Sequence, residues 1–286
     1  MKLGVVFPQN EIGNDPIAIR DFAQAAEALG YADLVAYDHV LGAHPDRDPK
    51  LTGPYTHEDP FHEPMVLFGF LAGQTERIEL ATGIVILPQR QTALVAKQAA
   101  EVAVLSGGRM RLGIGTGWNL VEYEALGCEW KNRARRMEEQ VELLRRLWSE
   151  PVIDYRGDFH RVDRAGILPL PERSIPIWFG GFAPVAWQRA VNTGDGLILG
   201  YGLKLCLPAL EYAKRALDEA GRDRASFGLE MQILYGKGEA HCAKEVAGWR
   251  EAGGTHAAVL TMKAGLEKPS DHIAAIRRFK EIADSA

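Results

Sequence analysis

The chain has 286 residues, of which 47% are hydrophobic and 25% are charged, and its formal net charge at pH 7 is −5. The composition is that of a globular protein, and the acidic balance argues against a nucleic-acid-binding protein, which would carry a basic face. No apolar run reaches the length of a membrane span, and the first residues lack the features of a signal peptide. Cys128, Cys206 and Cys242 are too scattered for a disulfide framework or a zinc site. We therefore expect a cytoplasmic protein with no membrane or nucleic-acid partner.

Short apolar runs alternate along the chain with longer segments of helical period. The predicted strands are 3–7, 32–36, 78–86, 109–114, 175–179, 196–199, 227–234 and 257–260. The predicted helices are 15–29, 64–74, 93–105, 132–148, 184–193, 208–220, 240–252 and 270–283. Pro16 in the first turn and Gly30 beyond the last turn mark the ends of the first helix. Residues 150–173 show no clean period and indicate an inserted loop or a small hairpin.

Strict alternation of strands and helices indicates a parallel sheet. Eight such units favour an α/β fold closed into a (β/α)8 TIM barrel, with the insertion at 150–173 and a single domain over residues 1–286. An open doubly wound sheet would have fewer strands and a glycine fingerprint at its first turn. The first turn here is Pro8-Gln9-Asn10, which contains no glycine.

The unusual residues of the sequence follow the predicted strands. In a (β/α)8 barrel the catalytic groups gather at the C-terminal ends of the strands. Glycine at such an end lets the backbone approach a flat ring or a phosphate, although ordinary turns also require glycine. The residues at these ends are Asp38, His39, Thr82, Gly83, Ile84, Pro88, Arg90, Gly115, Gly117, Trp118, Gly180 and Gly181. Together they form the candidate rim of a site.

Two polar segments have alternative interpretations. Residues 55–64 hold two histidines and three carboxylates, but their spacing matches no standard metal site, so we predict no metal and expect a lid or a solvated loop. The basic cluster at 131–136 either forms a solvated helix face paired with Glu138, Glu139 and Glu142, or contacts a phosphate or the acidic tail of a cofactor.

Four motifs give the chain a resemblance to a known superfamily. They are Asp38-His39, ATGIVILPQR at 81–90, LSGGRMRLGIGTGW at 105–118 continued by EYEALG at 122–127, and IPIWFGG at 175–181. The third is long and specific. On these motifs the chain resembles the bacterial luciferase-like superfamily from residue 4 to about residue 199. Within it, the chain is most similar to the branch that uses the deazaflavin coenzyme F-420 in place of FMN.

The resemblance implies a place for the cofactor ring, against the turn after the third strand. A non-proline cis peptide bond is common at that turn in such proteins, and by position it would join Gly83 to Ile84. The ring edge or ribityl chain would lie along the strand-four loop, and backbone N–H groups after the fifth strand would meet the phosphate. The implied cofactor-binding residues are Asp38, Gly83, Ile84, Gly115, Thr116, Gly117, Gly180 and Gly181.

The resemblance also implies that His39 and Asp38 lie near the reacting carbon. Imidazole titrates near neutral pH, so His39 is the candidate for moving a proton at a substrate oxygen, and Asp38 would orient it or hold the cofactor. Some deazaflavin dehydrogenases carry a glutamate where this chain has Trp118. Glu122 replaces that acid only if it points inward. Trp118 and Glu122 are thus assigned to the substrate pocket, with Trp118 stacking on an aromatic or apolar substrate.

The implied function is hydride transfer between coenzyme F-420 and a small organic substrate. The alternative is an FMN-dependent monooxygenase that uses reduced flavin and oxygen, because both activities share this barrel and pocket. A non-catalytic flavin-binding barrel and a metal-dependent barrel hydrolase are further alternatives. The presence of His39 disfavours the first, and the scarcity of His and Asp after strands five to eight disfavours the second. By resemblance we also expect a homodimer formed through the helices beside strands two and three.

Overall fold

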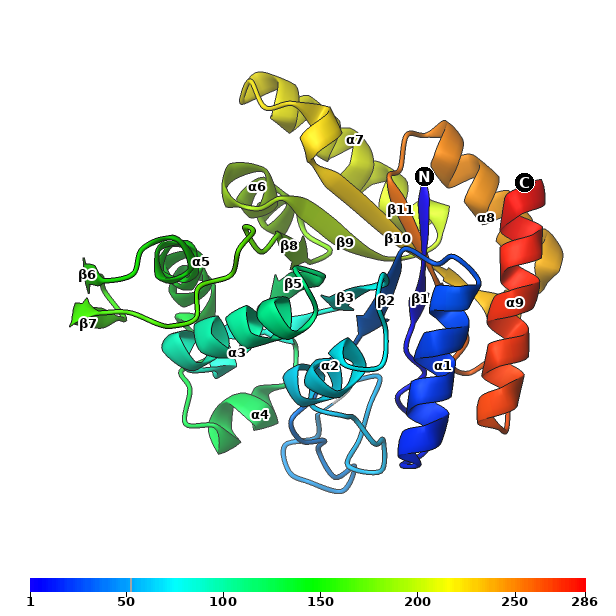
Figure 1. Ribbon diagram of the computed structural model, residues 1–286, viewed down its shortest axis with the longest axis horizontal. Coiled ribbons are helices and arrows are strands. Elements are labelled where there is room, and N and C mark those ends of the chain that lie inside the picture. Colours follow the sequence, from blue (N-terminus) through cyan, green and yellow to red (C-terminus); the bar gives the residue numbers. More distant parts are fainter. Residues whose placement is uncertain (52) are drawn as a thin grey trace.

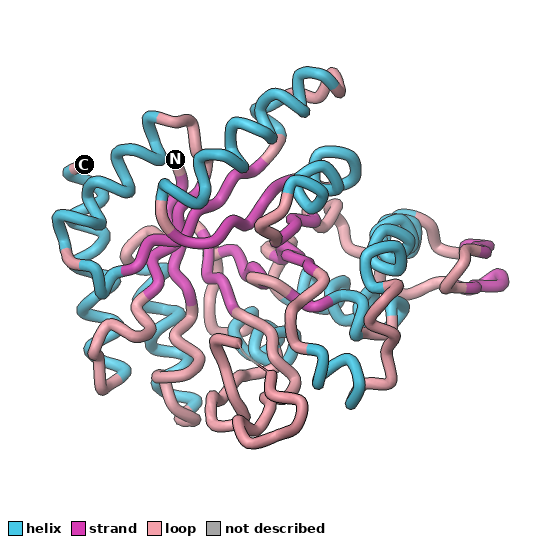
Figure 2. The backbone as a smooth tube through the Cα atoms, turned by 180° about the vertical axis from the view of Figure 1, so that it is seen from behind, coloured by secondary structure: helices cyan, strands magenta, loops and turns pink. Residues whose placement is uncertain are grey.

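The computed structural model describes residues 1–51 and 53–286, and its central strands form a closed parallel sheet surrounded by helices (Figure 1 and Figure 2). The sheet order is β3-β2-β1-β11-β10-β9-β8-β5-β4, and a further pairing of β3 with β5 closes the ring. The strands are β1 (Lys2–Val6), β2 (Asp33–Ala36), β3 (Glu79–Thr82), β4 (Val85–Ile86), β5 (Met110–Gly115), β8 (Ile177–Gly180), β9 (Gly196–Tyr201), β10 (Gly228–Leu234) and β11 (His256–Leu260). The predicted (β/α)8 TIM barrel is confirmed.

Helices follow the barrel strands around the outside, as the alternating pattern predicts (Figure 2). They are α1 (Pro16–Ala28), α2 (Pro64–Ala72), α3 (Thr92–Leu105), α5 (Arg133–Ser149), α6 (Pro184–Thr193), α7 (Leu203–Glu219), α8 (Glu239–Glu251) and α9 (Pro269–Ser285). Their apolar faces and the outward-facing strand residues form one large core. No helix in the described ranges is long and apolar enough to cross a membrane.

The third predicted strand is interrupted. Residues 78–86 form β3 and β4, which are separated by Gly83 and Ile84. Both pieces pair with β5, Leu80 opposite Met110 and Val85 opposite Ile114, so together they fill one position in the barrel. The interruption falls at the turn where the resemblance implies the cofactor ring.

Helix α7 begins five residues before the predicted start, so the prediction of 208–220 was wrong at its N-terminal end. Pro208 lies inside the helix, although proline has no N–H to give to the helix hydrogen bonds. A side chain of another helix satisfies the first N–H of α7, since Leu203 N donates to Glu245 Oε2 of α8 at 2.6 Å. Cys206 and Leu210, buried in the core, hold the segment on both sides of the proline.

The insertion at 150–173 contains a small hairpin, which is one of the two predicted forms. Strands β6 (Ile153–Arg156) and β7 (Arg161–Ala165) pair in antiparallel fashion and project from the barrel next to α5 (Figure 1). His160 anchors the turn, with Nδ1 2.7 Å from Glu139 of α5 and Nε2 2.7 Å from Thr92 of α3.

A short helix that the sequence analysis did not predict, α4 (Leu120–Ala125), follows β5.

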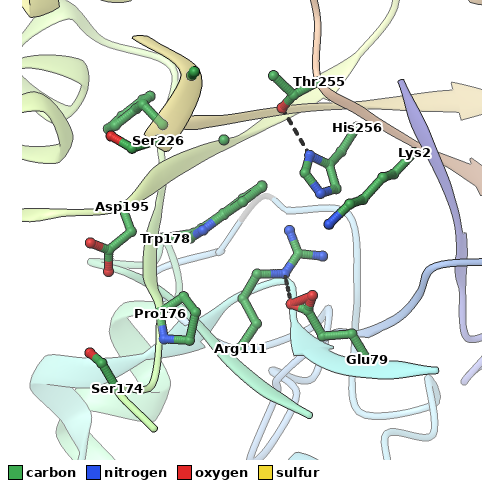
Figure 3. Close-up of a pocket in the computed structure, with 13 residues that line it drawn as sticks. Lys2, Glu79, Arg111, Ser174, Pro176, Trp178, Asp195, Ser226, Thr255 and His256 are labelled. Carbon is green, nitrogen blue, oxygen red and sulfur yellow. Dashed lines mark hydrogen bonds and ion pairs between the residues drawn. The ribbon is translucent and has the colours of Figure 1, made fainter. Parts of the chain in front are cut away.

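A buried ion cluster lies at the N-terminal mouth of the barrel. The Arg111 guanidinium is 2.6 Å from Glu230, 2.8 Å from Glu79 and 3.2 Å from Asp33, and it stacks 4.0 Å from the centre of a Trp178 ring. Figure 3 shows Arg111 and Trp178 facing a cavity of about 410 Å³ at this mouth. The cluster is therefore at the end of the barrel opposite the candidate rim.

Burial dominates the electrostatics of this cluster. It raises the pKa of Asp33 and of Glu79, and it raises the pKa of Glu230 from 4.5 to about 7, although Arg111 opposes each rise. The folded protein therefore binds a proton at Glu230 between about pH 4.5 and 7, where the unfolded chain does not. Because the folded state holds the extra proton, this group lowers the free energy of unfolding as pH rises through that window.

We expect the substitution Glu230→Gln to weaken the pH dependence of stability. In the wild type, the free energy of unfolding should fall between about pH 5 and about pH 8, in part through Glu230. The variant should show a smaller fall, measured by urea unfolding at both pH values. Glu251→Gln, which changes an exposed glutamate, is the control and should follow the wild type. An equally steep fall in Glu230→Gln would contradict the assignment.

Candidate active site

The turn between β3 and β4 lies at the C-terminal mouth of the barrel. It contains the expected cis peptide bond between Gly83 and Ile84. A Cβ atom at Gly115 would lie 2.3 Å from Ile84 Cδ1, and one at Gly180 would lie 2.9 Å from Ile84 Cγ2. Gly117 has φ +66°, and a Cβ atom there would lie 2.9 Å from Ile86 Cγ2. Of the glycines that the sequence analysis assigned to the cofactor, Gly115, Gly117 and Gly180 thus border this turn, and larger residues would collide with it, whereas Gly181 lies against Ala186.

Asp38 holds the turn from the side of β2. Its Oδ1 accepts a 2.7 Å hydrogen bond from Arg90 Nη2, and its Oδ2 accepts one from the Ile86 N–H at 3.2 Å. Arg90 also donates to Glu63 Oε1 at 2.8 Å, and Glu63 caps the N-terminus of α2. Burial raises the pKa of the Asp38 carboxyl, and the Arg90 guanidinium opposes that rise. Both oxygens of Asp38 are therefore engaged in holding the turn and the start of α2.

His39 is surrounded by aromatic rings. The ring centroids of Phe61, Tyr55 and Trp118 lie 4.8, 5.2 and 5.6 Å from that of the imidazole. His39 Nδ1 is 3.1 Å from Glu122 Oε1, and no hydrogen bond to Nε2 occurs within residues 1–51 and 53–286. The fold thus brings Trp118 and Glu122 together with His39, and leaves one ring nitrogen available.

Glu122 points inward from α4 and is buried. Its Oε1 also accepts hydrogen bonds from the backbone N–H groups of Val40 at 3.0 Å and Leu41 at 3.4 Å. Its Oε2 accepts one from Gln89 Nε2 at 3.3 Å. The orientation that the sequence left open is therefore inward, toward His39 and the loop that follows it.

A cavity of about 270 Å³ lies beside His39, between the loop after β2 and the segment 55–61. Its lining is His39, Val40, Leu41, Gly42, Tyr55, Thr56, His57, Asp59, Phe61 and Asn119. Asn119 supports this wall, since its Nδ2 donates to the Leu41 carbonyl at 3.1 Å. The described residues contain no cluster of three His, Cys, Asp or Glu side chains able to hold a metal ion.

The remaining predicted cofactor residues lie at the ends of β5 and β8. Thr116 O accepts a hydrogen bond from Tyr123 OH at 2.7 Å, which connects the loop after β5 to α4. Gly180 ends β8, and Gly181 O accepts one from Trp187 Nε1 at 3.0 Å at the start of α6. Residues 182–185, which lead into the first turn of α6, are exposed.

The basic cluster at 131–136 is partly engaged with protein groups. The Arg133 guanidinium lies 3.7 Å from the centre of the Trp130 ring, and Arg135 pairs with Asp158 of the hairpin at 2.6 Å. These contacts favour the solvated helix face, although the partners differ from the glutamates that the sequence analysis named. The sequence gives no indication of the Asp158 pairing, because the hairpin brings that residue back to the helix.

The sequence analysis placed Arg90 at the candidate rim without giving it a role, and it did not assign Gln89, Tyr55 or Phe61 to the site. Arg90 and Gln89 stand inside the motif at 81–90, directly after the turn, and an arginine there could have been matched to Asp38. Tyr55 and Phe61 lie in the segment interpreted as a lid or solvated loop. Two aromatic residues in such a polar segment were the available signal, because a solvated loop has no need of them.

Comparisons with known proteins identify the family and agree with the barrel fold. Residues 1–282 match the model of the luciferase-like monooxygenase family. An F-420-dependent glucose-6-phosphate dehydrogenase of Amycolatopsis mediterranei is 27% identical over 87% of this chain and 74% of its own length. A monooxygenase of Streptomyces bottropensis superposes with a TM-score of 0.82 at 19% identity, covering 100% of this chain and 99% of its own. An F-420-dependent secondary alcohol dehydrogenase superposes with a TM-score of 0.79 at 18% identity, covering 99% and 98%.

We expect Arg90→Met to destabilise the fold strongly. The substitution leaves Asp38 buried without its cation, and removing one partner of a buried pair costs about 3–5 kcal/mol. Urea unfolding measures this loss. The matched control is Arg135→Met, because the Arg135 side chain is 71% exposed and its pair with Asp158 should contribute less than about 1 kcal/mol. Equal losses in the two variants would show that Arg90 does not hold the turn.

Proposed function

Because the chain belongs to the luciferase-like monooxygenase family, we propose that it is an oxidoreductase that transfers hydride between the deazaflavin coenzyme F-420 and a small organic substrate. The observation that carries the proposal is the position of His39. It directly follows Asp38, which binds the Ile86 N–H, and it has aromatic rings around it and Nε2 available. The names of the relatives support the choice of cofactor, since both a sequence relative and a structural neighbour are F-420-dependent.

The residues at the mouth fit such a cofactor. Gly115 and Gly180 leave room for the Ile84 side chain, and in the proposal that side chain supports the flat ring. The exposed residues 182–185 at the start of α6 would suit a phosphate, since helix N-termini bind anions. In the proposal, Gly83, Ile84, Thr116 and Gly117 line the ring and ribityl chain, and Asp38 supports the turn from behind. When bound, F-420 supplies hydride transfer at carbon 5 of its ring.

His39 would move the proton that accompanies the hydride. A carbonyl oxygen that becomes a hydroxyl needs a proton, and general acid–base catalysis of this kind contributes about 10²- to 10⁴-fold to a rate. Tyr55, Phe61 and Trp118 would exclude water around the imidazole and offer faces to an aromatic or apolar substrate. Trp118 occupies the place of an acid found in some deazaflavin dehydrogenases, so we do not extend the sugar-phosphate activity of the named relatives to this chain.

The alternative function is an FMN-dependent monooxygenase. The Streptomyces bottropensis neighbour is described as a monooxygenase, and it superposes over the whole chain. Anaerobic mixing of the protein and reduced F-420 with a panel of aromatic aldehydes and ketones distinguishes the two. Oxidation of the deazaflavin without oxygen would support hydride transfer. Turnover that requires reduced FMN and consumes oxygen would replace our proposal by the alternative.

We expect His39→Ala to retain cofactor affinity and to lose turnover. The expected loss in kcat is about 10²- to 10⁴-fold, because the proton transfer is removed while the backbone that holds the cofactor remains. Steady-state kinetics with F-420 and the best substrate of the panel measure kcat, and fluorescence quenching measures affinity. His241→Ala, which changes a histidine on helix α8, is the control. Unchanged turnover in His39→Ala would refute the role of His39.

We also propose that the protein is a cytoplasmic homodimer. Its three cysteines are free, as is usual in a reducing compartment. Helices α2 and α3 lie next to each other (Figure 1) and expose apolar side chains, among them Val66, which is 71% exposed, with Phe70, Leu94 and Leu105. Exposed apolar side chains on two neighbouring helices are typical of a protein–protein interface.

We expect Phe70→Glu to convert the dimer to a monomer, because a charge buried at the interface without a partner opposes association. Light scattering at working concentration gives the mass directly. Val152→Glu, which changes an exposed apolar residue next to the β6–β7 hairpin, should leave the dimer intact. A monomer mass for the wild-type protein would refute the dimer.

A further inference from the structure

The two nitrogens of the His39 ring are in different surroundings. Nδ1 is 3.1 Å from Glu122 Oε1, inside the protein, whereas Nε2 has no hydrogen-bond partner in the described parts of the chain. A neutral imidazole carries its proton on one nitrogen only, and its partner decides which. Glu122 is therefore the group that selects the tautomer.

The hydrogen bonds of Glu122 Oε1 determine the direction of this contact. Oε1 already accepts from the backbone N–H groups of Val40 and Leu41, and an N–H group can only donate. An oxygen that accepts from both has no proton of its own pointing at the ring. The ring must then donate, so Nδ1 carries the hydrogen.

The carboxyl group is itself held in place. Its side chain is 1% exposed, and Gln89 Nε2 donates to the other oxygen. Asn119 caps α4 by accepting from Val121 N at 3.1 Å, and it also donates to Leu41 O, so the helix and the loop after His39 are fastened together. Movement of Glu122 away from His39 would leave the N–H groups of Val40 and Leu41 without this acceptor.

We propose that Glu122 is a positioning residue that fixes His39 in the tautomer protonated at Nδ1 and so makes Nε2 the nitrogen that exchanges a proton with the substrate oxygen. The expected effect of Glu122 on turnover rests on the proposed function, whereas the assignment of the His39 tautomer does not. In alcohol oxidation, neutral His39 takes the hydroxyl proton at Nε2 while hydride leaves the carbon for the oxidised deazaflavin and the O–H electron pair forms the C=O bond. The ring becomes imidazolium, and Nδ1–H remains bonded to Glu122.

The reverse direction uses the same atoms. Hydride from the reduced deazaflavin adds to the carbonyl carbon, the π electron pair moves to the oxygen, and imidazolium Nε2–H gives its proton to that oxygen. The ring returns to the neutral form protonated at Nδ1. With the other tautomer, Nε2 would carry the hydrogen in the neutral ring and could not serve as the base.

The first test is the tautomer in the cofactor-free wild-type protein. Nitrogen-15 NMR of labelled histidine distinguishes a protonated from an unprotonated ring nitrogen, and the signals of His39 are those missing from His39→Ala. We expect a protonated Nδ1 and an unprotonated Nε2 in the neutral ring. A protonated Nε2 would overturn the proposal, and this measurement needs neither a substrate nor a variant of Glu122.

Two substitutions of Glu122 separate positioning from charge. Glu122→Met removes the acceptor, so the His39 tautomer should shift toward Nε2–H, and kcat should fall about 10- to 100-fold while cofactor affinity changes little. Glu122→Gln retains a carbonyl oxygen for Val40, Leu41 and the ring. It should keep the Nδ1–H tautomer and recover most of the kcat lost in Glu122→Met.

The matched control is Glu124→Gln on the same helix, which changes an exposed glutamate and should leave both tautomer and kcat unchanged. If Glu122→Gln retained the tautomer but lost as much kcat as Glu122→Met, charge rather than positioning would be the role of Glu122. If Glu122→Met failed to fold, the wild-type tautomer and the Glu122→Gln kinetics would still decide whether Glu122 positions His39. Absence of deazaflavin turnover in the wild-type protein would refute the proposed function, and unchanged turnover in His39→Ala would refute the role of His39. Either result would leave the tautomer assignment intact.

Discussion

The contact between Asp38 and the turn that joins β3 to β4 organises the C-terminal mouth of the barrel. Asp38 binds the Ile86 N–H directly, and through Arg90 and Glu63 it fixes the start of α2. From the other side, Gly115 and Gly180 allow Ile84 to lie close to their backbone. Because β2, β4, β5 and β8 all contact this one turn, the positions of the candidate site residues depend on it.

Neighbouring residues at the end of β2 have different surroundings. Asp38 is committed to the turn, whereas His39 meets the aromatic rings of Tyr55, Phe61 and Trp118, with Glu122 behind it. One residue thus supports the framework, and the next is free to act on a substrate. At the opposite end of the barrel, the N-terminal mouth also contains buried ion pairs, which Arg111 forms with its three carboxylates.

The sequence predicted the barrel because eight alternating strand and helix patterns have few other solutions, and it predicted the position of the cis peptide bond by resemblance. It missed the early start of α7, whose first N–H is accepted by Glu245 of α8. It also missed Arg90 as the partner of Asp38, and the aromatic rings around His39. These features depend on contacts between residues more than 15 positions apart, and no local pattern reports such contacts.

The central claim is that the C-terminal mouth binds a deazaflavin for hydride transfer. Its most direct test is a fluorescence-quenching titration of the purified protein with coenzyme F-420 and, separately, with oxidised and reduced FMN. The account predicts saturable, tight binding of F-420 and weak or no binding of either form of FMN. Tight binding of FMN, with none of F-420, would contradict it and establish the flavin alternative.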